Sequence, residues 1–310
     1  MSEQVAGPIR LTLPATSANL GSAFDSAGLA MALTLMIEAS VNVDADPPEL
    51  QIEATGRDAE RVSRIRNNLI FETYRQLLTG AGRQVMPLRL RIHNEIPLGM
   101  GCGSSAAALL AGVLLANDFG RLGWDLHACM EEACRREGHP DNVAACALGY
   151  MTVSANSEGK VVAVTCGQSV DWKLMLALPS ASLATERARA LLPTAYSRAD
   201  AVHNIQRSAL LVGAFAQNRG DLLHVAMEDR IHQPYRSQVC PLVPVLLPLA
   251  GSDGVLGVAL SGAGPGVLLV LEASASVEQV KQRIKQAASD PNLEVLETKI
   301  AGGVEVSYSR

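Results

Sequence analysis

The sequence is poor in aromatic residues and contains no long apolar run. Phe, Trp and Tyr together make up 4% of its 310 residues. The longest apolar stretch, from Ala106 to Ala116, is shorter than the roughly 20 residues that cross a bilayer, so we expect a buried helix there and no membrane partner. The sequence starts without a basic segment followed by an apolar core and without a transit-peptide composition, which predicts residence in the cytoplasm.

An excess of basic charge and paired cysteines are also lacking. Lys and Arg number 26 against 31 Asp and Glu, which gives a net charge of −5. Because nucleic acids bind basic surfaces, we expect no nucleic-acid partner and favour a small molecule. The six cysteines include no CxxC pair and no Cys/His metal spacing, which predicts reduced, mostly buried thiols rather than a zinc site or disulfides.

The apolar patterns predict an α+β fold of two domains, residues 1–160 and 161–310. Alternation of apolar residues predicts strands at residues 9–13 and 88–92, and helical spacing predicts helices that begin near residues 69, 104 and 125. After residue 149 we expect three strands, then helices to about residue 249, and then a strand, a strand, a helix and a strand. These strands and the last helix are expected at 150–154, 161–165, 174–178, 255–260, 267–271, 277–287 and 293–300.

One segment is dense in glycine and ends in small helix-forming residues. It consists of Pro97, Leu98, Gly99, Met100, Gly101, Cys102, Gly103, Ser104, Ser105, Ala106 and Ala107. Alternating glycines let a backbone approach a ligand closely, and a helix start offers free N–H groups and a positive dipole end. The segment therefore predicts a phosphate site, with a flexible turn capped by Ser104 as the alternative. Its spacing matches neither a Walker A loop nor GxGxxG.

A carboxylate lies at the end of an apolar helix face. Glu137 continues the helical spacing of Leu126, Met130 and Ala133, and burying its charge without a partner is costly. Mg²⁺ is a natural partner, because it binds one or two carboxylates together with phosphate oxygens. The alternative is that Glu137 frays into solvent while the nearby Asp141 is an ordinary N-cap.

Two further segments have simpler interpretations when taken alone. Residues 14–25 follow a strand and are rich in small and polar residues, which is typical of a solvated loop in which Asn19 and Asp25 form turns. Residues 260–266 join two apolar strands, so a close hairpin turn explains their glycines equally well.

Taken together, these segments resemble the galactokinase, homoserine kinase, mevalonate kinase and phosphomevalonate kinase (GHMP) superfamily. The glycine-dense segment matches its phosphate-loop pattern Pro-x-Gly-x-Gly-Leu-Gly-Ser-Ser-Ala, with Cys102 in place of the usual Leu. The segments that resemble the homoserine kinases within the superfamily are residues 14–25, His-x-Asp-Asn-Val at 139–143 and Ser-Gly-x-Gly-Pro at 261–265. Ser22-Ala23 replaces the Val-Gly that is common before Phe24.

The resemblance implies a fold, an activity and partners. The fold is a ribosomal-protein-S5-type amino-terminal domain and a ferredoxin-like carboxyl-terminal domain, with ATP in the cleft between them. The activity is transfer of the γ-phosphoryl group of ATP, with Mg²⁺, to the side-chain hydroxyl of L-homoserine in threonine biosynthesis, and a homodimer is expected. Two alternatives stay open: a sister kinase that acts on mevalonate or a sugar, and a non-catalytic ATP-binding regulator.

The resemblance also implies roles for individual residues. Residues 97–107 wrap the ATP phosphates and Asn68 lies near the adenine. Glu137 holds Mg²⁺ together with Ser104 or Ser105. The substrate pocket contains Asn19, Asp25, His139, Asp141, Arg189 and Arg236.

Two of the substrate residues are arginines, which are implied to bind a carboxylate. A guanidinium is suited to bidentate carboxylate recognition, so Arg189 and Arg236 fit an amino-acid substrate. Thr185 lies four residues before Arg189, on the same helix face, and is expected to donate a hydrogen bond near the transferred group.

Arg187 is expected to be solvated. We expect surface or capping positions, and no role, for His93, His127, His203, His224 and His232.

Asn142 occupies the position at which several sister kinases keep a catalytic Asp. An amide cannot accept a proton, so Asn142 is expected to orient the reacting groups. The loose transition state of phosphoryl transfer makes a strong base optional. The hydroxyl proton is then left to Asp141 or Asp25, directly or through the substrate's own phosphate.

Overall fold

The computed structural model describes residues 8–42, 49–64, 67–181 and 185–308, without the side chains of Thr185 and Glu186. The strands are β1 (Ile9–Ala18), β2 (Ala27–Val41), β3 (Leu50–Gly56), β4 (Leu88–Asn94), β5 (Met151–Ser157), β6 (Lys160–Cys166), β7 (Lys173–Leu178), β8 (Val255–Leu260), β9 (Val267–Leu271), β10 (Glu294–Lys299) and β11 (Glu305–Tyr308). The helices are α1 (Ala59–Arg64), α2 (Leu69–Gly80), α3 (Ser104–Gly120), α4 (Leu126–Glu137), α5 (Asp141–Leu148), α6 (Thr185–Arg189), α7 (Arg198–Ala216), α8 (Leu223–Ala226), α9 (Gln233–Arg236), α10 (Leu242–Leu246) and α11 (Val277–Ala287), with 3₁₀ turns at Gly220–Leu222 and Leu247–Leu249.

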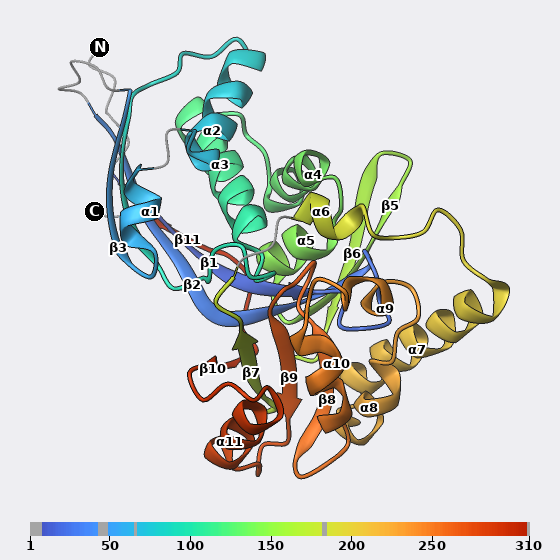
Figure 1. Cartoon of the computed structure of the whole chain (residues 1–310). Helices are drawn as coiled ribbons and strands as arrows, with labels where there is room; N and C mark the ends of the chain where they lie inside the picture. Colours follow the sequence, from blue (N-terminus) through green and yellow to red (C-terminus); the bar gives the residue numbers. More distant parts are fainter. Residues whose placement is uncertain (1–7, 43–48, 65–66, 182–184, 309–310) are drawn as a thin grey trace.

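The first of two sheets is organised around the long strand β2. Its order is β11-β1-β2-β4-β3, and the hairpin of β5 and β6 branches from β2. The first residues of β2 pair with β5 and its later residues pair with β4, while β1 lies along its other side. Helices α2 to α5 lie together over this sheet, with α3 and α5 in contact with β1 (Figure 1).

The second sheet is antiparallel and has the order β10-β7-β9-β8. Its strands β7, β9 and β8 are buried on both faces, whereas the edge strand β10 is partly exposed. Successive side chains of β7 point to opposite faces of the sheet. Leu174 and Leu176 therefore join the same core as the first sheet, whereas Met175 and Ala177 join a second core. Helices α10 and α11, in the lower half of Figure 1, contribute buried residues to that second core. The two sheets thus share one continuous core.

The predicted α+β class is confirmed, and so are most predicted elements. α2 begins after Asn68, whose side chain caps it, α3 begins at Ser104, and α4 follows its cap Asp125. β8, β9 and α11 have the predicted bounds. By strand pairing, the chain changes sheet between Cys166 and Lys173, and β11 returns to the first sheet. The domain boundary at 160/161 stays a prediction.

The apolar stretch of residues 106–116 forms the middle of α3, and all but one of its residues are buried, as predicted. Gly112 lets α2 approach α3, because a Cβ there would lie 2.5 Å from the carbonyl oxygen of Ile70.

No helix in the described part of the chain is long and apolar enough to cross a membrane. All six cysteines are unpaired, and only Cys166 is partly exposed, which confirms the prediction of free, mostly buried thiols.

The close packing of α2 on α3 predicts a large cost for a cavity between them. Leu78 is fully buried and packs against Gly120, so Leu78→Ala is expected to lower the free energy of unfolding by about 2–5 kcal/mol in urea denaturation. Leu126→Ala is the control, because Leu126 is 38% exposed and surface changes usually cost less than about 0.5 kcal/mol. Equal losses in the two variants would contradict this packing.

Candidate active site

A cavity of about 330 Å³ lies where loops from both sheets meet. Most residues that the sequence singled out line it: Asn19, Asp25, Asn68, Leu98, Gly99, Gly101, Cys102, Gly103, Ser104, Ser105, Glu137, His139, Asp141, Asn142, Arg189 and Arg236. Pro97, Met100, Ala106 and Ala107 do not line it, and the two alanines are buried inside α3. Thr185 begins α6, but its side chain lies outside the described part of the structure. One cavity therefore unites segments that are far apart in the sequence.

The glycine-dense segment ends at the amino terminus of α3. Gly99, Gly101 and Gly103 have φ angles of +72°, +74° and +71°, which favour glycine. Gly103, rather than Ser104, is the N-cap, and no side chain caps this end. The first helical hydrogen bond joins the N–H of Ala107 to the carbonyl of Gly103. The N–H groups before Ala107 thus have no helical partner and can bind an anion.

The same glycines are needed for packing within the protein. A Cβ on Gly101 would lie 2.0 Å from the carbonyl oxygen of Ser261, and a Cβ on Gly103 would lie 1.9 Å from Oγ1 of Thr16. The glycine-dense loop therefore packs closely between β1 and the turn that follows β8. Burial raises the pKa of the Cys102 thiol to about 12, so this side chain stays neutral beside the proposed phosphate site.

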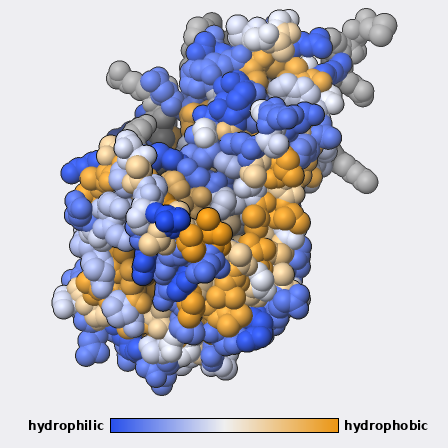
Figure 2. All heavy atoms as spheres, turned by 90° about the vertical axis from the view of Figure 1, so that its right-hand side faces the viewer, coloured by the Kyte–Doolittle hydropathy of each residue, from blue (hydrophilic) through white to orange (hydrophobic). Residues whose placement is uncertain are grey.

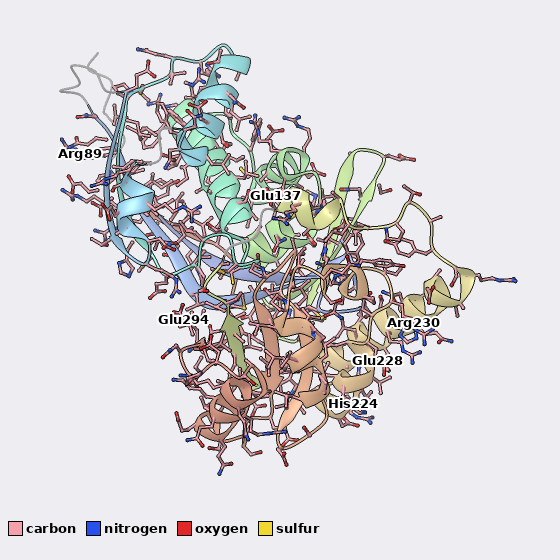
Figure 3. All side chains as sticks on the ribbon, viewed as in Figure 1. Arg89, Glu137, His224, Glu228, Arg230 and Glu294 are labelled. Carbon is pink, nitrogen blue, oxygen red and sulfur yellow. The ribbon has the colours of Figure 1, made fainter. Side chains whose placement is uncertain are left out.

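Glu137 lies at the end of α4, beside α6 in Figure 3. Its Oε2 accepts a hydrogen bond from Oγ of Ser105 at 3.0 Å. Burial raises the pKa of Glu137, although the charge of His139 and the bond from Ser105 oppose the shift. Glu137 lines the cavity, so the alternative in which it frays into solvent is wrong. A half-buried carboxylate beside a helix amino terminus is a suitable ligand for a cation that also binds phosphate.

His139, Asp141 and Asn142 form a hydrogen-bonded group at the start of α5. Oδ1 of Asp141 accepts from the backbone N–H of Asn142 at 2.7 Å and lies 2.6 Å from Nδ1 of His139. Burial lowers the pKa of His139, but the hydrogen bond and charge of Asp141 outweigh it, so the pKa is raised. Pro140 is the N-cap, so the interpretation of Asp141 as an N-cap is wrong.

Thr16 was not singled out from the sequence, yet it orients Asn142. Its hydroxyl donates to Oδ1 of Asn142 at 2.8 Å, and both side chains are buried. Nδ2 of Asn142 donates to Oδ1 of Asp141 at 3.4 Å. Because the amide oxygen is occupied, the second N–H of this nitrogen is the group that remains for a ligand in the cavity. Thr16 lies in β1, and nothing in its local sequence indicates this contact.

The two predicted arginines have different surroundings. Arg189 donates two hydrogen bonds to Asp25, from Nη2 at 2.7 Å and from Nη1 at 3.0 Å. Arg236 is only 1% exposed and has no carboxylate within 4 Å among the described residues. Burial lowers its pKa, and the charge of Arg189 lowers it further. The pocket therefore holds one paired and one unpaired guanidinium, an arrangement that favours binding of an anion.

Asn19 connects this pocket to the second sheet. Its Oδ1 accepts from the backbone N–H of Asp25 at 3.0 Å, and its Nδ2 donates to the carbonyl of Gly262 at 2.9 Å. Gly262 lies in the turn between β8 and β9, so the predicted hairpin is confirmed. The same turn also lines the cavity.

His232 is the N-cap residue of α9, so the capping position predicted for it is confirmed, although its side chain makes no capping hydrogen bond and does not lie at the surface. His232 is fully buried, directly before α9, and its ring contacts Arg236. The signal that could have identified it is the spacing of four residues between His232 and Arg236, which places both on one helix face.

A second group of metal-ligand atoms, from Asp25, His139 and Asp141, lies within 4.8 Å of one another. Both oxygens of Asp25 already accept from Arg189, and Nδ1 of His139 is bonded to Asp141. Mg²⁺ prefers oxygen ligands, so Glu137 with a loop serine matches it better than this group does.

Comparison with known families defines the class of protein. The model described as GHMP kinases N terminal domain matches residues 68–150, and the model described as GHMP kinases C terminal matches residues 211–290. A homoserine kinase of Solibacter usitatus is 44% identical over 263 residues, 84% of each chain. A homoserine kinase of Synechocystis is 39% identical over 269 residues, 84% of this chain and 85% of the other. The chain therefore belongs to the homoserine kinase family of the GHMP kinases.

Solved structures share the fold across this superfamily. A homoserine kinase of Cytophaga hutchinsonii has a TM-score of 0.81 at 23% identity and covers 99% of both chains. A mevalonate kinase of L. major, solved in complex with R-mevalonate, has a TM-score of 0.72 at 15% identity and covers 97% of this chain and 99% of the other. Kinases with different names thus share the fold, so the choice of substrate depends on the side chains in the cavity.

The close packing of the glycine-dense loop predicts that Gly103→Ala destabilises the fold and not only nucleotide binding. Gly123→Ala is the matched control, because Gly123 has a φ of +75° but open space around it. A left-handed backbone costs a non-glycine residue about 1–2 kcal/mol in both variants, and Gly103→Ala adds the clash with Thr16. We expect a clearly lower thermal midpoint for Gly103→Ala. Equal midpoints with weaker ATP binding would show that Gly103 is required by the ligand alone.

Proposed function

We propose that the chain transfers the γ-phosphoryl group of ATP to the side-chain hydroxyl of L-homoserine and forms O-phospho-L-homoserine for threonine biosynthesis. The observation that carries this proposal is the unpaired, buried guanidinium of Arg236 in the same cavity as the amino terminus of α3. The helix end suits a phosphate, and the guanidinium suits a carboxylate. The names of the curated relatives support the same activity.

On the nucleotide side, the proposed ATP site combines the glycine loop with an apolar wall. Val62, Leu69 and Ile70 line the cavity next to Asn68 and suit an adenine ring. Oδ1 of Asn68 accepts from the N–H groups of Ile70 and Phe71, so its amide nitrogen is the group available to the base. The phosphates would lie along the loop and end at the start of α3.

The residues near α3 suit Mg²⁺ bound with the phosphates. Glu137 offers a carboxylate oxygen whose pKa burial raises, and a cation would offset the cost of that burial. Of the two loop serines, Ser105 is hydrogen-bonded to Glu137, so we assign it as the second ligand. When bound, Mg²⁺ would neutralise charge on the transferring phosphoryl group.

On the substrate side, the charged groups match an amino acid. Arg236 would bind the carboxylate, with Arg189 beside it. Asp25 and His139 would lie around the amino group and the hydroxyl-bearing end. This arrangement makes a substrate without a carboxylate, such as a sugar, a poor match.

Positioning would supply most of the catalysis. The amide nitrogen of Asn142, oriented by Thr16, would hold the reacting oxygen. Both oxygens of Asp25 are engaged by Arg189, whereas Oδ2 of Asp141 has no hydrogen-bond partner among the described residues. We therefore assign the hydroxyl proton to Asp141, and the proposed hydrogen bond from Thr185 completes the set.

We propose cytoplasmic residence from the sequence composition and a homodimer from the resemblance alone. Figure 2 shows groups of apolar side chains among polar ones on the face that carries α7. Val202 and Ile205 of α7 are 45% and 68% exposed.

A coupled ATPase assay of the purified chain with homoserine, mevalonate or galactose tests the proposed function. We expect turnover with homoserine and at most background with the other two. Turnover with mevalonate or galactose would establish a sister kinase, and ATP binding without turnover would favour the non-catalytic regulator.

The metal assignment predicts that Glu137→Gln lowers turnover by orders of magnitude, because charge neutralisation at the phosphoryl group is lost while the shape is kept. Glu132→Gln is the control, because Glu132 lies on the same helix and pairs with Arg135 and Arg136. Steady-state kinetics at varied Mg²⁺ measure both variants. A Glu137→Gln enzyme with near-normal turnover at modest Mg²⁺ would refute the assignment.

The carboxylate assignment predicts that Arg236→Ala raises the KM for homoserine roughly ten- to a hundredfold, the loss of a charge-assisted hydrogen bond worth about 1.5–3 kcal/mol. The KM for ATP should change much less. The KM for homoserinol, which lacks the carboxylate, should rise less than the KM for homoserine. Arg187→Ala is the control, because Arg187 is exposed. Equal increases in the KM for homoserine and the KM for ATP would contradict the assignment of Arg236 to the substrate carboxylate.

A further inference from the structure

Arg236 is anchored by protein groups in a way that leaves one of its nitrogens for a ligand. Its Nη1 donates to the carbonyl of Gly262 at 3.2 Å, and its Nε donates to the carbonyl of Ala188 at 3.4 Å. Its Nη2 has no hydrogen-bond partner within the described ranges, and Arg236 lines the cavity. The direction of Nη2 therefore depends on the groups that fix the guanidinium plane.

His232 supplies the remaining side-chain contact. Its Nδ1 lies 3.3 Å from Nη1 of Arg236, and its Nε2 lies 2.8 Å from the carbonyl oxygen of Gly21. A carbonyl oxygen can only accept and a guanidinium can only donate. Nε2 must therefore carry the ring proton and Nδ1 must be the acceptor, so the ring is neutral. Complete burial also lowers the pKa of His232, which favours the same state.

An aromatic ring and an acid complete the surroundings of His232. Phe24 stacks on it with ring centroids 5.3 Å apart, and the guanidinium of Arg236 lies 5.3 Å from the centre of the same Phe24 ring. Arg189 lies over this ring at 5.7 Å. Oδ2 of Asp229 is 3.6 Å from Nε2 of His232, but it accepts from the backbone N–H of His232 at 3.0 Å. Asp229 thus fixes the backbone of His232, and the ring of His232 contacts Arg236.

We propose that His232 is a positioning residue for substrate recognition: by accepting from Nη1 it turns the guanidinium of Arg236 so that Nη2 meets the carboxylate of the amino-acid substrate. The inference rests on the proposed function and adds a residue to it. A neutral acceptor suits this place, because a carboxylate here would pair with Arg236 and compete with the substrate. A charged imidazolium would repel the guanidinium.

If His232 had a purely structural role, loss of its Nε2 contact would be more harmful than loss of its Nδ1 contact, because the bond from Nε2 to Gly21 ties the loop after β1 to α9. The proposed positioning role predicts the reverse. Two substitutions separate the roles. His232→Asn places an amide oxygen near the position of Nδ1 and keeps an acceptor for Arg236. His232→Gln places an amide nitrogen near the position of Nε2 and keeps a donor for Gly21.

Steady-state kinetics of these two variants test the proposal. We expect His232→Gln to raise the KM for homoserine about tenfold, equivalent to about 1.4 kcal/mol, with little change in the KM for ATP. His232→Asn should recover most of that loss. In an Arg236→Ala background, His232→Gln should raise the KM no further, because the two residues act through one contact. A larger KM in the Asn variant than in the Gln variant, or additive effects with Arg236→Ala, would overturn the proposal.

An activity-independent measurement keeps this inference separate from the proposed function. Nitrogen-15 NMR of the imidazole reports the tautomer directly, and we expect neutral His232 with its proton on Nε2. A proton on Nδ1, or a doubly protonated ring at neutral pH, would overturn the positioning role even in an enzyme that phosphorylates homoserine. Failure of the wild-type chain to turn over homoserine would instead refute the proposed function.

Discussion

The turn between β8 and β9 contacts both sides of the cavity, and the arrangement of the site depends on it. The carbonyl of Gly262 accepts from Asn19 at 2.9 Å and from Arg236 at 3.2 Å. The neighbouring Ser261 hydroxyl donates to the carbonyl of Gly101 at 2.8 Å. A single turn thus fixes the loop after β1, the glycine-dense loop and Arg236 relative to one another. Because buried backbone groups must be paired, displacing this turn would disturb all three.

The charges of the cavity explain how one site can hold two anions. Free N–H groups at the start of α3 favour phosphate at one end, and Arg236 favours a carboxylate at the other. Glu137 lies at the end of α4, where it accepts from Ser105 beside the start of α3, and prevents the site from being uniformly positive. Burial raises the pKa of Glu137 and lowers that of Arg236, so both charged forms are disfavoured until ligands of opposite sign are bound.

Local signals in the sequence predicted the parts of the fold and site that nearby residues determine. The start of α2 at its cap Asn68 and the start of α3 at Ser104 are examples. β2 was not predicted, because its apolar and small residues run almost continuously and show no alternation. The ion pair of Asp25 with Arg189 spans 164 residues, so only the folded chain shows it. For the same reason, the sequence indicated the glycine-dense loop but not its close packing against Thr16.

We propose that one cavity binds ATP and an amino acid in a fixed relative position. A crystal structure with homoserine and a non-hydrolysable ATP analogue tests it most directly. We expect the homoserine carboxylate about 3 Å from Nη2 of Arg236, with the terminal phosphate at the amino terminus of α3 and the substrate hydroxyl facing that phosphate. A carboxylate bound elsewhere, with Arg236 still held only by protein groups, would contradict it.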